Sequence, residues 1–76
     1  MATRFYGRIS LRPVRMLRDL GDLADAIVAQ LGRAEAEVTI TVEIEATAER
    51  GFTEDVRRTV SENARTLKFE AHEFED

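Results

Sequence analysis

The 76-residue sequence contains no cysteine and no tryptophan, and it has one proline and one histidine. Without cysteine the chain can form neither a disulfide framework nor a thiolate nucleophile. No apolar run approaches the roughly 20 residues that a membrane span requires, and no signal-peptide core follows Met1. We therefore expect a cytoplasmic protein without a membrane partner.

The length of the chain allows one small domain. Domains seldom subdivide below roughly 100 residues, so we expect residues 1–76 to fold as a single domain. A chain of this size buries only about 60–65% of the surface that its unfolded form exposes, which predicts modest stability. Its 43% hydrophobic content is normal for a globular protein, and its 34% charged content is high without being typical of a disordered one.

The net charge of -4 hides a difference between the two ends of the chain. Residues 1–33 carry six arginines and three aspartates, whereas residues 34–76 carry five basic and twelve acidic residues. Opposite charges attract when folding brings them together. We therefore expect the two ends to attract each other in the folded state.

Three segments alternate between apolar and other side chains, namely residues 4–12, 37–47 and 67–71. A period of two is typical of a half-buried β-strand, so we predict three strands. The apolar faces consist of Phe5, Gly7, Ile9 and Leu11 in the first segment, of Val38, Ile40, Val42, Ile44 and Ala46 in the second, and of Leu67, Phe69 and Ala71 in the third.

The stretch from residue 13 to residue 31 changes to the three- and four-residue spacing of an amphipathic helix. Pro13 suits the first turn of this helix, and Gly32 stands where a left-handed C-cap residue is expected. Gly21 lowers helix stability by about 1 kcal/mol relative to alanine, which indicates close packing or a local bend there. The predicted inner stripe consists of Val14, Leu17, Leu20, Ala24, Ile27 and Leu31.

A second helix is predicted to begin after a turn at residues 49–51. Thr53 is a favourable N-cap, and Glu54 and Asp55 in the first turn complement the helix dipole. The inner stripe of this helix consists of Val56, Val60 and Ala64. The acidic tail from residue 72 to residue 76 is expected to fray, with Phe74 as its candidate for docking.

These elements follow in the order β-α-β-α-β. We predict an α+β fold of two layers, with a three-stranded sheet and both helices on one face of it. Right-handed crossovers imply the spatial order 1-2-3, with the long strand in the middle. Parallel sheets are usually covered on both faces. Either one strand is antiparallel, or the bare polar face meets something else.

A row of arginines is the most suggestive surface feature. Arg4, Arg8 and Arg12 (the arginine row) share the polar face of the first segment with Tyr6. Such a row suits phosphate contacts, and Tyr6 suits base stacking. Alternatively, the arginine row pairs with Glu43 and Glu45 across neighbouring strands. We favour cross-strand pairing, because a net acidic protein is an unusual nucleic-acid binder. Further i,i+4 pairs are expected in the first helix, at Arg15–Asp19 and Arg18–Asp22.

The residues offer little for catalysis or metal binding. The candidate carboxylates Glu43, Glu45, Glu70 and Glu73 are expected on a solvated face, without the apolar pocket that an acid–base site requires. His72 is the single histidine, and a metal site requires more nitrogen or sulfur ligands than this chain offers. The four glycines are scattered and form no phosphate-binding loop. We therefore expect no enzymatic activity, no cofactor and no metal in this chain.

The segment from Arg58 to Glu70, RTVSENARTLKFE, supports a family resemblance together with RFYG near the start and VTITVEIEA in the middle. The chain resembles, from about Arg4 to Phe74, the carboxyl-terminal end of a family of large prokaryotic predicted AAA+-type ATP-binding proteins of unknown function. The resemblance implies a terminal module whose nucleotide-binding motifs lie far upstream. It implies no catalytic residue here, and the remainder of the parent ATPase becomes an expected partner.

We therefore predict a non-catalytic interaction or assembly module that docks onto the parent ATPase or another protein. The alternative is a small nucleic-acid-binding domain that uses the arginine row. The open edges of the predicted sheet also favour a homodimer. The candidate interaction surface consists of Arg4, Tyr6, Arg8, Arg12, Thr41, Glu43 and Glu45.

Overall fold

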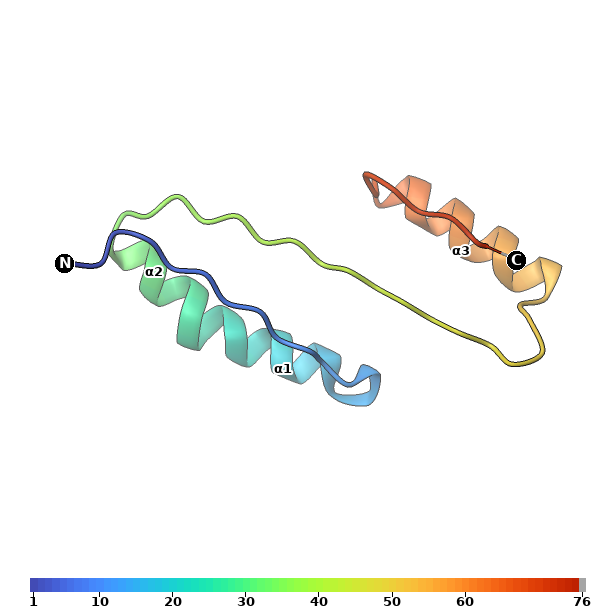
Figure 1. Cartoon of the computed structure of the whole chain (residues 1–76), viewed down its shortest axis with the longest axis horizontal. Coiled ribbons are helices and arrows are strands. Elements are labelled where there is room, and N and C mark those ends of the chain that lie inside the picture. Colours follow the sequence, from blue (N-terminus) through green and yellow to red (C-terminus); the bar gives the residue numbers. More distant parts are fainter. Residues whose placement is uncertain (76) are drawn as a thin grey trace. The chain divides into compact units, whose positions relative to one another are not determined.

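A computed structural model describes residues 1–75 of the chain, so Asp76 of the predicted acidic tail lies outside the described residues. Contacts divide the chain into two compact units, Met1–Val42 and Glu43–Asp76, and each is described by itself. The elements are η1 (Pro13–Arg15), α1 (Met16–Leu23), η2 (Ala24–Val28), α2 (Ala29–Arg33) and α3 (Glu54–Thr66) (Figure 1).

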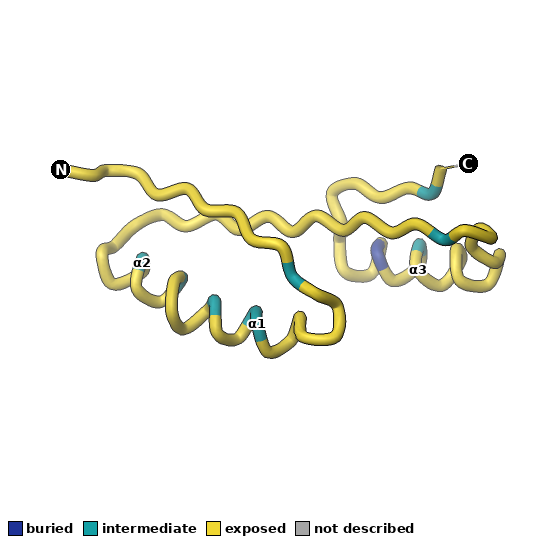
Figure 2. Tube along the Cα trace, turned by 60° about the horizontal axis from the view of Figure 1, so that its bottom comes forward, coloured by how far each residue is buried: buried dark blue, intermediate teal, exposed yellow. Residues whose placement is uncertain are grey.

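The first unit is one helical stretch with an extended segment along it. The 3-10 turn η1, α1, the π-helical turn η2 and α2 follow one another without a break from Pro13 to Arg33. The predicted first helix is therefore confirmed, and it continues two residues beyond the expected end. Residues 1–12 run back along this helix (Figures 1 and 2). Ile9 lines a shallow hollow together with Leu23 and Ile27.

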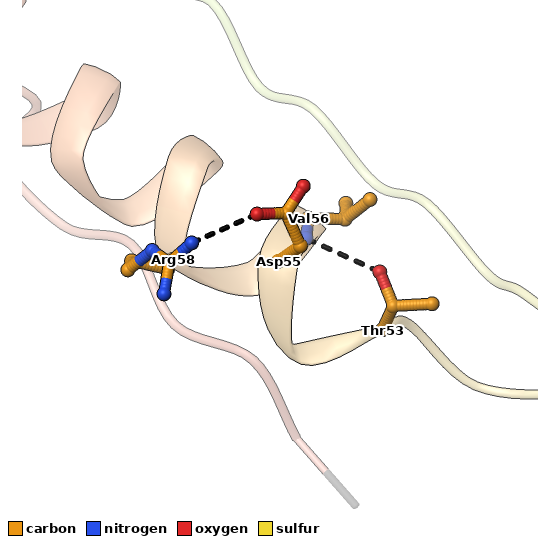
Figure 3. Close-up of polar contacts among 4 residues, drawn as sticks. All are labelled: Thr53, Asp55, Val56 and Arg58. Carbon is orange, nitrogen blue, oxygen red and sulfur yellow. Dashed lines mark hydrogen bonds and ion pairs between the residues drawn. The ribbon is translucent and has the colours of Figure 1, made fainter.

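The second unit is built on α3, where the sequence predicted the second helix. The Thr53 hydroxyl accepts a hydrogen bond of 3.2 Å from the Val56 amide, as expected of an N-cap (Figure 3). One turn further on, the Arg58 guanidinium donates to the Asp55 carboxylate at 2.8 Å (Figure 3). After α3 the chain turns and runs back along the helix to Phe74 (Figure 1).

Both helical stretches end in the same hydrogen-bonded turn. The Glu35 and Ala36 amides donate to the carbonyls of Gly32 and Leu31 at 3.0 and 3.4 Å. After α3, the Lys68 and Phe69 amides donate to the carbonyls of Arg65 and Ala64 at 3.0 and 2.9 Å. These are the paired bonds of a Schellman motif.

The left-handed positions of these two turns are occupied by Glu35, with φ 59, and by Lys68, with φ 61. The prediction that Gly32 is the left-handed C-cap is therefore wrong. Gly32 lies inside α2, and the helix continues to Arg33. A glycine allows a helix to end in a left-handed residue, but it does not force the helix to end there. The predicted turn at residues 49–51 is confirmed, with Gly51 at φ 78.

The predicted three-stranded α+β sheet is wrong. Among residues 1–75 the structure is helical and has no strand. Residues 4–11 and 37–47 are extended (Figure 1). Their amide and carbonyl groups form no hydrogen bond with the backbone of another described residue. Residues 67–71 include the terminal turn of α3 and form no strand either. The alternating pattern describes the two faces of each segment, whereas a sheet also requires a distant partner for each ladder.

The core is correspondingly small. Ala64, at 4% exposure, is the one buried residue in the described part of the chain (Figure 2). Among the residues of the predicted inner stripes, Leu20 and Leu31 are half-buried, whereas Val14 and Leu17 remain 91% and 87% exposed. Most apolar side chains therefore have little cover within their own unit.

The cap of α3 yields a first prediction. Replacing Thr53→Ala removes the oxygen that satisfies the Val56 amide, so α3 should lose about 1 kcal/mol of stability. Circular dichroism at 222 nm across a denaturant series measures this loss. Thr53→Ser keeps a hydroxyl and is the matched control, which should behave as the unchanged chain. Equal stability of the Ala and Ser variants would show that the cap does not stabilise α3.

Gly21 yields a second prediction. Close packing was one of two explanations expected for this glycine, the other being a local bend, and close packing is not found, because a Cβ there would meet nothing within 4 Å. Gly21→Ala should therefore stabilise α1 by about 1 kcal/mol and slow amide exchange in that helix roughly fivefold. The matched control is Gly51→Ala, which forces alanine to φ 78 and should destabilise its turn. Faster exchange in α1 after Gly21→Ala would contradict the prediction.

Candidate interaction surface

The candidate interaction surface begins on the extended segment that precedes η1. Arg4, Tyr6, Arg8 and Arg12 are all exposed, and Tyr6 is 81% exposed. The backbone at Arg12 is extended, with φ -84 and ψ 134, and alternate side chains of an extended chain share one face. This segment therefore presents three guanidinium groups without an intervening acidic residue.

The remaining candidate residues lie on the second extended segment. Thr41, Glu43 and Glu45 are exposed, and they alternate with an apolar set. That apolar set is exposed as well, at 39% for Val38, 61% for Ile40, 67% for Val42 and 69% for Ile44. The segment thus presents both an acidic face and an apolar face that has little cover.

Ion pairs among the described residues are local to the helices. Arg15 lies 3.9 Å from Asp19, which confirms the predicted i,i+4 pair, and Arg58 lies 2.8 Å from Asp55. The expected pair between Arg18 and Asp22 is not formed among residues 1–75. Neither the arginine row nor Glu43 and Glu45 takes part in an ion pair within that range. The cross-strand pairing expected from the sequence requires two neighbouring strands, and residues 1–75 form none.

The second unit contains an aromatic cluster, of which only the docking of Phe74 was predicted. The Phe52 and Phe74 rings meet edge to face, with centroids 5.2 Å apart and an interplanar angle of 66°. The Arg57 guanidinium lies 5.8 Å from the centroid of the Phe74 ring, within the range of a cation–π contact. The expected docking of Phe74 is thus found. The position of Phe52 directly before the N-cap was a usable signal, because an apolar residue there commonly packs back onto the first turns of the helix.

This cluster borders a shallow, open hollow of about 300 Å³. Its walls are formed by Glu54, Arg57, Arg58, Ser61 and Phe74. The hollow of about 390 Å³ in the first unit is equally open and is lined mostly by apolar atoms. Both hollows suit shallow contact with another surface better than enclosure of a small molecule.

The described residues bring no set of potential metal ligands together. Within residues 1–75 no group of three or more histidines, cysteines and carboxylates is placed to hold a metal ion. His72 is exposed and lies edge to face with Phe69, at a centroid distance of 6.5 Å. In the same range, none of the helices combines the length and the apolar character needed to cross a membrane.

Comparison with protein-family models, with curated proteins and with solved structures finds no match for this chain. The resemblance to the carboxyl-terminal end of a large ATP-binding protein family therefore stays a prediction. What the structure supplies is a pair of extended segments, one basic and one acidic, whose side chains and backbone are available for contact.

Proposed function

We propose that this chain is a non-catalytic interaction module that completes its core by docking onto a protein partner. The observation that carries the proposal is the exposure of regularly patterned apolar faces. Ile40, Val42 and Ile44 recur at every second position and are each more than 60% exposed. Random exposure of single apolar residues is ordinary, whereas a patterned apolar face is typical of a surface that meets another one.

The energetics favour assembly. Burying one Val, Leu or Ile side chain completely contributes about 1.5–3 kcal/mol, and a small protein is stable by only about 5–15 kcal/mol. Burial of the apolar face of the second segment is therefore comparable with the whole stability of a small domain. A partner that covers this face would supply burial that the residues within each unit do not.

The backbone supports a particular mode of docking. Extended segments with unused amide and carbonyl groups bind partners by strand addition, in which main-chain hydrogen bonds give affinity and alternate side chains give specificity. The candidate surface has both features, because each extended segment alternates one charged or polar face with one apolar face. The parent ATPase, which the family resemblance implies, is one proposed partner.

The proposal predicts that the native protein migrates as an assembly. An antibody against this chain should detect a larger species on a native gel of cell extract than on a denaturing gel. On the denaturing gel, a band far above 8.6 kDa would identify a module of a larger protein, and a band near 8.6 kDa would identify a separate subunit. Equal apparent masses near 8.6 kDa under both conditions would contradict docking.

Arg8→Glu adds a test at the surface itself. The substitution reverses a charge on the exposed first segment and should weaken the native assembly at least about tenfold, with helicity at 222 nm unchanged. Arg50→Glu is the matched control, because Arg50 is also exposed and lies in the turn before α3. Loss of helicity in the Arg8 variant would instead give Arg8 a structural role within the chain.

A second candidate function, binding of single-stranded nucleic acid, is favoured by the arginine row itself. Arg4, Arg8 and Arg12 are exposed, and the nearly fully exposed Tyr6 ring lies on the same segment as a stacking surface. If three phosphates are contacted, the logarithm of the binding constant should fall with the logarithm of salt concentration with a slope of about -2. Titration of a labelled single strand measures this slope, and Arg8→Ala with Arg12→Ala should reduce it. No binding at low salt would exclude this function.

A further inference from the structure

The two extended segments have complementary patterns. In an antiparallel register, Arg4 lies opposite Glu45 and Arg12 lies opposite Glu37, while Arg8 lies opposite Thr41. The same register sets apolar residues opposite each other along the other face, pairing Phe5 with Ile44, Ile9 with Ile40 and Leu11 with Val38. Opposite charges and paired β-branched or aromatic residues stabilise an antiparallel ladder. One register therefore sets two arginine–glutamate pairs on one face and three apolar pairs on the other.

One chain cannot form this ladder with itself. Directly opposed residues of an antiparallel pair lie about 4.5–5.5 Å apart at their Cα atoms. Arg12 and Glu37 are separated by the unbroken helical stretch Pro13–Arg33, which is about 30 Å long at 1.5 Å per residue. The residues between Arg33 and Glu37, even if fully extended, recover only about half of that distance. The antiparallel register is therefore accessible only between two chains.

The direction of the segments fits a symmetric pair. Within the first unit, residues 1–12 and 36–42 run in the same direction along the helix (Figures 1 and 2). A two-fold axis perpendicular to the segments reverses both directions in the second copy. The first segment of each copy then runs antiparallel to the second segment of the other, so that the contact is made twice.

We propose that the partner of the candidate interaction surface is a second copy of this chain, joined by reciprocal antiparallel pairing of residues 4–12 with residues 37–45. This inference rests on the proposed docking function and names its occupant. Charge complementarity carries it, because two copies bring together four pairs of one arginine and one glutamate. The amide and carbonyl groups of residues 4–11 and 37–45 form no backbone hydrogen bond within the described chain. In the dimer they would bond to the segment of the other copy and form two ladders. The apolar faces of both segments come to lie on one side of each ladder.

A charge-swap experiment on the purified full-length chain tests this pairing. One variant carries Arg4→Glu and Arg12→Glu, and the other carries Glu37→Arg and Glu45→Arg. Each variant alone opposes like charges and should have a dimer dissociation constant raised at least about tenfold. An equimolar mixture restores every opposite-charge pair, so a heterodimer should form as tightly as the unchanged dimer. Sedimentation equilibrium across concentration measures each constant.

The matched control reverses Arg50 and Lys68 to glutamate. Both residues are exposed and lie outside the paired segments, and the net charge changes as much as in the first variant. The control should leave the dimer constant within about threefold, because the salt-screened long-range term is small. If the control weakens the dimer as strongly as the arginine variant does, the loss of affinity is explained by net charge alone, and the proposed pairing is overturned.

Disulfide trapping tests the register, and the absence of native cysteine makes it clean. Ser10→Cys chains mixed with Thr39→Cys chains should form a mixed disulfide, because these positions lie directly opposite each other. Thr47→Cys is the matched control, since Thr47 lies on the same face but opposite residue 2, so its mixed disulfide with Ser10→Cys should be at least about tenfold less abundant. Preferential trapping with Thr47 would overturn the register.

The outcomes separate this inference from the proposed function. A purified chain that stays monomeric at every concentration, while the native extract still shows an assembly, overturns the second copy as partner and leaves docking to another protein. A monomer in both conditions overturns both proposals. A dimer that passes the charge-swap and trapping tests supports both.

Discussion

The unbroken helical stretch from Pro13 to Arg33 is the constraint on which the rest of the first unit depends. A helix of this length holds the residues at its two ends about 30 Å apart. The extended segments before and after it can therefore return along its side, but they cannot fold onto each other as a hairpin. Any backbone pairing between them within one chain would have to be parallel, which is the less stable arrangement per residue.

That constraint accounts for the small core. A single amphipathic helix with one extended segment beside it covers only part of its apolar stripe, so Leu20 and Leu31 are half-buried while Leu17 is exposed. Removing the exposed apolar faces from water requires more surface than each unit contains by itself. The ordering of each segment costs conformational entropy that local helix contacts alone offset poorly. A second surface that covers these faces would shift that balance.

The local parts of the fold were predictable from the sequence, and the non-local part was not. The helices, the Thr53 cap and the Gly51 turn depend on interactions within about four residues, and the structure has all of them. The strands depend on partners far away in the chain, and alternation carries no information about which partner is present. The error at Gly32 has a different origin, because Glu35 accepts a left-handed backbone that glycine would have adopted more readily.

The candidate site followed the same division. The spacing of the arginines predicted that Arg4, Arg8 and Arg12 share a face. The acidic character of the second segment was equally plain from the sequence. The pairing of these charged residues within the chain was not, because it assumed a sheet that the structure lacks. The clustering of Phe52, Arg57 and Phe74 depends on the return of the chain along α3, which no local pattern specifies in full.

The charge on the extended segments also limits what they bind. An exposed apolar strand without charges pairs indiscriminately and aggregates, and charged residues on edge strands suppress such contacts. Here the face opposite the apolar one carries charges in both segments, and the sign of the charge differs between the two segments. Two first segments repel each other through their arginines, and two second segments repel each other through their glutamates. Only the pairing of a first with a second segment is favoured on both faces, so in the proposed dimer the side chains that promote association also select its register.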